Sequence, residues 1–195
     1  LDLTSKYGYQ IKQSNWFATA AINLKTQFSK GFDYSKPDQS YLSNFLSPGY
    51  LALGLGADYI PNDHFQISLH PLTSRLTYVK DKMVFDPNRD GIPTEAFGVI
   101  PGKHFVYQLG AYVGGRYKAK LMENIALDNR FGVFSNYLKD PQNIVLAYSA
   151  LLDMKVNRFI STQITADLFY DDNQIGKLQL KETLGVGLNY KFGKY

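Results

Sequence analysis

The chain has 195 residues and a formal net charge of +4, and only 19% of its residues are charged, against about 25% in soluble globular domains. It contains no cysteine, which excludes a disulfide framework and thiolate metal sites. The charges are spread along the chain without a basic stripe, so no nucleic-acid partner is expected. No apolar run reaches the roughly 18 to 20 residues that a membrane-spanning helix needs.

Apolar and polar residues alternate from the first residue onwards. In residues 181–192, Leu184, Val186 and Leu188 alternate with small or polar residues. Because successive side chains of a strand point to opposite faces, this period predicts β-strands and no helix. About nine such stretches are expected, at residues 1–11, 16–28, 49–59, 65–79, 104–121, 125–138, 144–157, 159–171 and 181–192.

The alternation slips by one residue at His70-Pro71. Proline cannot donate a hydrogen bond to a neighbouring strand, so a bulge or irregularity is predicted at this point.

The connections between the stretches alternate in length. Short polar turns are expected at 12–15, 61–64, 122–124 and near Asn157, and the connections between them are longer: 29–48, 80–103, 139–143 and 171–179. Short turns at one end and longer loops at the other are typical of a transmembrane β-barrel. The stretches also exceed the five or six residues that are usual for strands of soluble proteins.

These patterns predict an all-β fold, an antiparallel outer-membrane β-barrel formed as a single domain by residues 1–195. The apolar face of the strands would meet lipid, and tyrosines near strand ends would meet the headgroups. The residues expected to face lipid include Leu51, Leu53, Leu55, Leu109, Val113, Leu184, Val186 and Leu188. A soluble lipocalin-like barrel, which turns its apolar face inward around a ligand, is the alternative, and the sorting of the loops disfavours it.

Single-chain bacterial barrels close with an even number of strands, so about nine strands predict an incomplete barrel, with about ten to twelve strands in the full-length protein. An unpaired edge is then expected at residues 1–11 or at residues 181–192.

Several segments resemble a known family. They are "LDLTSKYGYQ", "NWFATAAINLKTQF", "LSNFLSPGYLALGLGADY", "SNYLKDPQNI", "MKVNRFIS" and "FYDD…QLKETLGVGLNYKF". They are similar to a family of Bacteroidota proteins that are described only as a domain of unknown function and taken to be outer-membrane barrels. The resemblance implies that the chain corresponds to the C-terminal part of the family's length and lacks N-terminal strands. It implies no activity.

The polar face of the strands carries acids and bases on neighbouring strands, which predicts cross-strand ion pairs. Lys6 lies on this inward face, and the residues expected to line the lumen are Lys25, Asp58, Arg116, Lys118, Asp128, Arg130, Asp153, Lys155 and Asp167. They could select solutes in a hydrated pore, or they could fill a closed lumen. Tyr112, Phe134 and Phe169 also point inward, which favours the filled lumen.

Residues 86–91, "DPNRDG", place oxygen ligands at the first, third and fifth positions of a possible calcium loop, namely Asp86, Asn88 and Asp90. The twelfth position is Phe97, where a calcium loop has a glutamate, and the same composition also suits an ordinary exposed turn. Calcium is therefore a speculative ligand, and no other cofactor is expected.

His70 and Ser74 could form a base and a nucleophile. Four residues along a strand span about 13 Å, however, and no third residue orients the pair. No catalytic residue and no enzymatic activity are therefore predicted.

Three functions remain open for a protein of the bacterial outer membrane. The preferred one is a structural or accessory barrel that contacts membrane lipid and a larger outer-membrane complex. A narrow pore for small solutes is the second, and a lipid-modifying enzyme is the weakest. All three remain open because barrels of one design serve all three roles.

Overall fold

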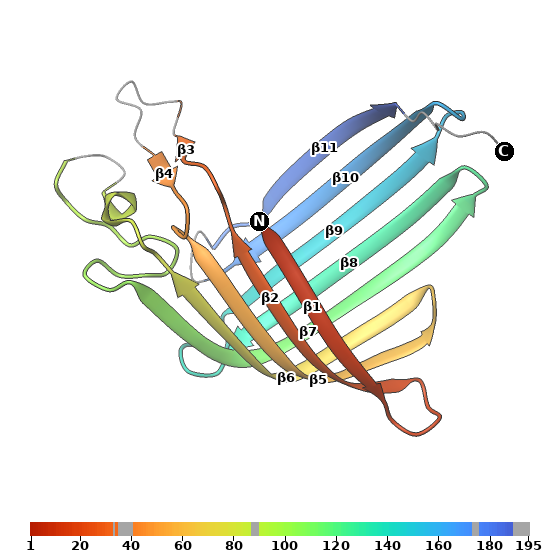
Figure 1. Ribbon diagram of the computed structural model, residues 1–195, viewed down its shortest axis with the longest axis horizontal. Coiled ribbons are helices and arrows are strands. Elements are labelled where there is room, and N and C mark those ends of the chain that lie inside the picture. Colours follow the sequence, from red (N-terminus) through yellow and green to blue (C-terminus); the bar gives the residue numbers. More distant parts are fainter. Residues whose placement is uncertain (33, 35–40, 87–89, 173–175, 189–195) are drawn as a thin grey trace.

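The computed structural model of the chain describes residues 1–32, 34, 41–86, 90–172 and 176–188. In this part of the chain, nine strands form one antiparallel sheet that curls around a concave face (Figure 1). Each strand pairs with its neighbours in chain order: β1 (Asp2–Gln10), β2 (Trp16–Thr26), β5 (Gly49–Asn62), β6 (Phe65–Tyr78), β7 (Phe105–Met122), β8 (Ile125–Asn136), β9 (Ile144–Lys155), β10 (Ile160–Asp171) and β11 (Gln179–Leu188). The predicted all-β fold and its nine long strands are confirmed.

The sheet is open. Within the described residues, β1 pairs only with β2, and β11 pairs only with β10. Every residue of both edge strands is exposed. The predicted unpaired edge is confirmed at both ends of the sheet, and these residues by themselves do not form a closed barrel. No described helix is long and apolar enough to cross a bilayer.

The predicted irregularity in β6 is a bulge. The pairing of β5 with β6 shifts between Leu55 and Ala57, and that of β6 with β7 shifts between His70 and Thr73. The bulge presses β6 against β5, where a Cβ atom added to Gly56 would lie 2.0 Å from the carbonyl oxygen of Leu69. Glycine is the residue that permits this approach.

The two faces of the sheet differ in the way the alternation predicts. Several polar side chains on the concave face are buried, among them Asp58, which is 1% exposed, and His70, which is 5% exposed. The opposite, outer face carries exposed apolar side chains, and Leu55 is 52% exposed there. The other predicted outward residues are exposed or half-buried: Leu51, Leu53, Leu109, Val113, Leu184, Val186 and Leu188. A lipocalin-like barrel would have the opposite distribution.

The two longest connections contain structure that the alternation did not predict. They hold the short strands β3 (Gly31–Phe32) and β4 (Tyr41–Ser43) and the 3-10 helix η1 (Lys82–Phe85). The side-chain amide of Asn44 donates to Asp81 over 2.8 Å and joins the two connections. Most of the buried apolar residues lie in the second connection and form a small core: Val79, Val84, Phe85, Ala96 and Val99.

Candidate functional site

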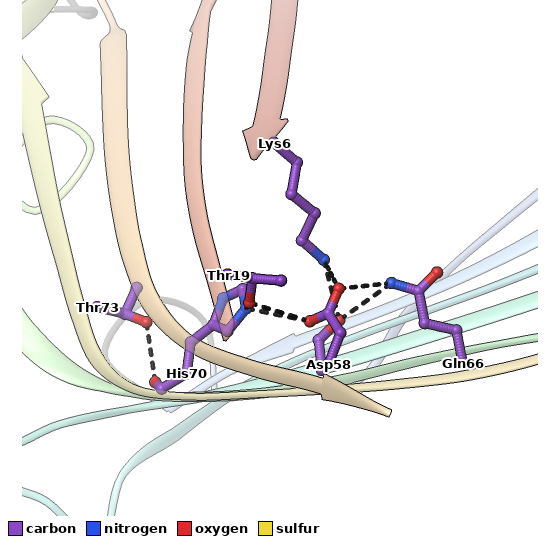
Figure 2. A network of polar contacts seen from close by, with 7 residues as sticks. Lys6, Thr19, Asp58, Gln66, His70 and Thr73 are labelled. Atoms are coloured by element: carbon purple, nitrogen blue, oxygen red, sulfur yellow. Dashed lines mark hydrogen bonds and ion pairs between the residues drawn. The ribbon is translucent and has the colours of Figure 1, made fainter. Parts of the chain in front are cut away.

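A group of polar side chains surrounds the buried Asp58 and His70 on the concave face of β1, β2, β5 and β6. We call it the Asp58 cluster, and it consists of Lys6, Thr19, Asp58, Gln66, Ser68 and His70 (Figure 2). The register explains why these residues meet, since Asp58 lies opposite Phe17 of β2 and Ser68 of β6. The sequence predicted Asp58 to line a lumen, and its partners lie on the same polar face.

Asp58 accepts contacts from three sides. The ammonium of Lys6 reaches across β2 to its carboxylate, and Gln66 donates to it over 2.9 Å. His70 Nε2 lies 3.3 Å from Asp58 Oδ1. A carboxylate 1% exposed is stable only when it is paired and hydrogen-bonded, and these donors meet that need.

The imidazole of His70 contacts both Asp58 and Thr19 through the same nitrogen, Nε2. Thr19 Oγ1 lies 3.0 Å from the same Nε2. A relay of the serine-protease type needs the acid and the nucleophile on opposite nitrogens, so Asp58, His70 and Thr19 do not form one.

Ser74 is also excluded as a partner of His70. It lies opposite Leu53 and Leu109, which belong to the outer face. His70 lies on the concave face, because the bulge shifts the alternation between the two residues. This agrees with the expectation that they form no catalytic pair.

A second charged group lies on β7 and β8. Arg116 Nε donates to Asp128 Oδ1 over 3.0 Å, and its Nη2 contacts Oδ2 of the same carboxylate. Arg130 donates to both oxygens over 3.3 and 3.2 Å. Two guanidinium groups share one carboxylate, which leaves an excess positive charge on this part of the concave face.

The structure divides the other predicted lumen residues into smaller groups. Asp167 accepts from Ser149 over 2.6 Å, and Asp153 accepts from Gln163 over 3.4 Å. Lys25 lies opposite Tyr50, and Lys118 opposite Asp128. Among the described residues, no side-chain contact is recorded for Lys25, Lys118 or Lys155, so the predicted charges form separate groups and not one continuous network.

A cavity of about 700 Å³ lies on the concave face. Its charged and polar lining includes Lys6 of β1, His70 of β6, Arg130 of β8 and Asp167 of β10. Strands near opposite ends of the sheet therefore face one another across the cavity. The guanidinium carbon of Arg75 lies 4.6 Å from the centre of the Phe134 ring, and the charge of Asp171 on β10 acts on Arg75.

The candidate calcium loop falls partly outside the described residues, because Asn88 is not among them. Asp86 accepts hydrogen bonds from the backbone of Asp90 and Gly91 at 3.2 and 3.1 Å, and Asp90 accepts from the backbone of Ile92 at 2.9 Å. Both carboxylates thus stabilise the turn. The described residues contain no group of three or more His, Cys, Asp or Glu side chains that could hold a metal ion.

One carboxylate joins strands at the loop end of the sheet. Asp172, just after β10, accepts from the hydroxyl of Tyr170 and from the backbone N–H of Ile144. These donors hold the pKa of Asp172 below its usual range.

Sequence reasoning placed Lys6 on the polar face with Asp58 but missed three members of the Asp58 cluster as site residues, namely Thr19, Gln66 and Ser68. Their common signal is a polar side chain on the face that also carries Asp58. The alternation gives that face, but the contact of Lys6 with Asp58 depends on the register of three strands, which it does not give.

Comparison with known proteins gives one similarity. A family model described as "Protein of unknown function (DUF3078)" matches residues 1–32, which contain β1, β2 and β3. No curated protein and no solved structure matches the chain. Over its first two long strands, the chain is therefore similar to a family whose function is not known.

Proposed function

We propose that the protein is an outer-membrane β-barrel with a structural or accessory role in a larger outer-membrane assembly. The observation that carries this proposal is the inverted distribution of side chains over the sheet. Asp58 and His70 are nearly inaccessible on the concave face, whereas Leu55 and Val113 are 52% and 40% exposed on the outer face. Such a surface is stable against lipid and unfavourable against water.

Aromatic residues on the outer face support the same location. They gather near both ends of the strands, and the exposed ones include Trp16, Tyr78, Phe105, Tyr107 and Tyr117. Tyr107 and Tyr117 lie ten residues apart on β7. At a rise of about 3.3 Å per residue and a tilt of about 40°, this separation spans about 25 Å, the height of the apolar band of a membrane barrel.

The ends of the sheet differ as they do in outer-membrane barrels. Residues 11–15, 63–64, 123–124 and 156–159 connect strands at one end, and the longer connections with β3, β4 and η1 lie at the other. By analogy, the short turns would face the periplasm.

The interior favours a structural role over a wide pore. The Asp58 cluster and the Arg116–Asp128–Arg130 group occupy the concave face, and the guanidinium of Arg75 stacks on the ring of Phe134 there. Ion-paired side chains of this kind fill and stabilise small barrels. The cavity of about 700 Å³ is the observation that favours the second candidate, a narrow pore for small solutes.

Conductance across planar bilayers separates the two candidates. We expect the full-length protein to insert and conduct little, and its variant Arg130→Ala/Lys155→Ala to conduct more or open more often, because two long side chains leave the interior. A large, steady conductance of the unmodified protein would establish the pore instead. Failure to insert into bilayers at all would contradict the membrane location.

A further inference from the structure

A groove opens beside the start of β7, at the end of the sheet that carries the long connections. It has a volume of about 670 Å³ and is lined by Gly98, Ile100, Gly102, Lys103, His104, Phe105, Val106, Tyr107 and Lys139. Two turns shape its rim, with positive φ angles of 81° at Gly98 and 87° at Gly102. We call it the Lys103–Lys139 groove.

The charge of this groove is of one sign. Lys103 and Lys139 are its two lysines, and among the described residues no carboxylate lines it. Asp140 follows Lys139 in the turn but does not line the groove. Within the described residues, no ion pair is recorded for either lysine. The third basic residue, His104, is engaged, since its Nδ1 lies 3.1 Å from the carbonyl oxygen of Val79.

The groove continues into the apolar outer face. Phe105 and Tyr107 are 59% and 47% exposed, and Leu109 follows them on the same side of β7. Ile100 adds an apolar side chain that is 48% exposed. The ammonium groups of Lys103 and Lys139 therefore lie beside a row of apolar side chains, Phe105, Tyr107 and Leu109, which we call the apolar track.

We propose that the Lys103–Lys139 groove binds the phosphate headgroup of an anionic membrane lipid, with the lipid's acyl chain lying along Phe105, Tyr107 and Leu109. The inference rests on the proposed membrane location. A phosphate diester satisfies two cations that lack a carboxylate, and the apolar track accommodates the chain. A free anion would leave the track unexplained.

Quenching of tryptophan by brominated lipids tests both the location and the site. The chain has one tryptophan, Trp16, whose side chain is 39% exposed on the outer face. A second reporter is Leu138→Trp in a Trp16→Phe background, beside Lys139. The protein is placed in phosphatidylcholine vesicles that contain brominated phosphatidylcholine or brominated phosphatidylglycerol, and the relative affinity for the two lipids is obtained at the reporter.

We expect brominated phosphatidylcholine to quench Trp16, because the outer face meets lipid. At the Leu138→Trp reporter we expect phosphatidylglycerol to be preferred by about fivefold or more, since each basic residue near a membrane surface contributes about 1 kcal/mol. Lys103→Gln/Lys139→Gln should bring that preference close to one. The matched control, Lys118→Gln/Lys120→Gln, removes the same charge at the other end of β7 and should leave it unchanged.

The results distinguish failure of the membrane location from failure of the lipid site. Trp16 that escapes quenching contradicts the membrane location itself. Quenched Trp16 without a headgroup preference at the reporter overturns the groove alone, as does a control variant that loses as much preference as Lys103→Gln/Lys139→Gln. A preference that millimolar inorganic phosphate abolishes would assign the groove to a free anion and would also overturn the lipid proposal.

Discussion

Hydroxyl groups of tyrosine satisfy polar atoms on the otherwise apolar outer face. The bulge in β6 leaves the carbonyl of Pro71 outside the regular ladder, and the Tyr137 hydroxyl donates to it over 3.0 Å. The Tyr148 hydroxyl donates to Asn129 over 2.8 Å. Water would satisfy these atoms at no cost, whereas in lipid an unpaired carbonyl or amide costs several kcal/mol. The pairing of these atoms is what a lipid environment requires.

Replacing Tyr137 tests whether a tyrosine hydroxyl satisfies a polar atom that faces lipid. Tyr137→Phe should lower the free energy of unfolding in phospholipid vesicles by about 1 to 3 kcal/mol, because the Pro71 carbonyl loses its donor in an apolar medium. The measurement is urea unfolding followed by far-ultraviolet circular dichroism. Tyr117→Phe is the control, since the described residues give the Tyr117 hydroxyl no recorded partner. Equal effects of the two changes would contradict the explanation.

Replacing Gly56 by alanine tests how tightly β5 and β6 pack at the bulge. In Gly56→Ala the new Cβ would lie 2.0 Å from Leu69 O and 2.6 Å from His70 Cα, so the strands must separate. We expect the free energy of unfolding to fall by about 1 to 3 kcal/mol, the usual cost of overpacking. Gly185→Ala is the matched control, because its nearest atom, Gln163 O, is 3.9 Å away. Stability that falls equally in both variants would show that the bulge is not the cause.

At this scale, the sequence predicted which residues share a face but not which residues touch. The alternation placed Asp58 and Arg130 on the polar face, and the slip at His70-Pro71 indicated the bulge. The Asp58 cluster needs Lys6 to reach across a whole strand, and that distance depends on register and sheet curvature. Neither quantity is encoded in the period of one strand.

The strands were predictable because their period is simple and sustained over many residues. Residues 16–28 were expected as a strand, and β2 covers Trp16–Thr26. The elements of the long connections were not predictable, since β3 has two residues and η1 has four. Their small core around Val79 and Val99 arises from contacts between separated loop segments. A local sequence pattern does not predict such contacts.

Arginine scanning tests the two faces of the strands. Leu53→Arg and Val113→Arg should each lower the free energy of unfolding in vesicles by about 2 to 4 kcal/mol, the cost of a cation on a lipid face near the bilayer midplane. Gln163→Arg, on the polar face of β10, should cost far less because its side chain remains hydrated. Urea unfolding of the three variants gives the comparison. Similar costs on both faces would contradict the assignment of the outer face to lipid.

At the scale of the whole molecule, the question is how the open sheet closes into a barrel. Among the described residues, β1 and β11 are free edges, and their unpaired backbone groups are ones that a bilayer does not tolerate. All neighbours in the sheet are antiparallel, so strands alternate in direction and β1 runs the same way as β11. Joining them directly would make one parallel pair. We propose that an odd number of further strands stands between them, which restores antiparallel pairing and an even total.

Cysteine cross-linking in the full-length protein tests this closure, and residues 1–195 contribute no cysteine of their own. Pairs of outward residues on the two edges, such as Leu3→Cys or Tyr7→Cys with Leu184→Cys or Val186→Cys, should not form a disulfide in vesicles. An intervening strand would hold them about 10 Å apart, twice the spacing of neighbouring strands. Ile164→Cys/Leu184→Cys is the positive control, because these residues are direct partners of β10 and β11. Efficient disulfide formation in any edge pair, comparable to that control, would show that β1 and β11 close the barrel themselves and that no further strand is needed.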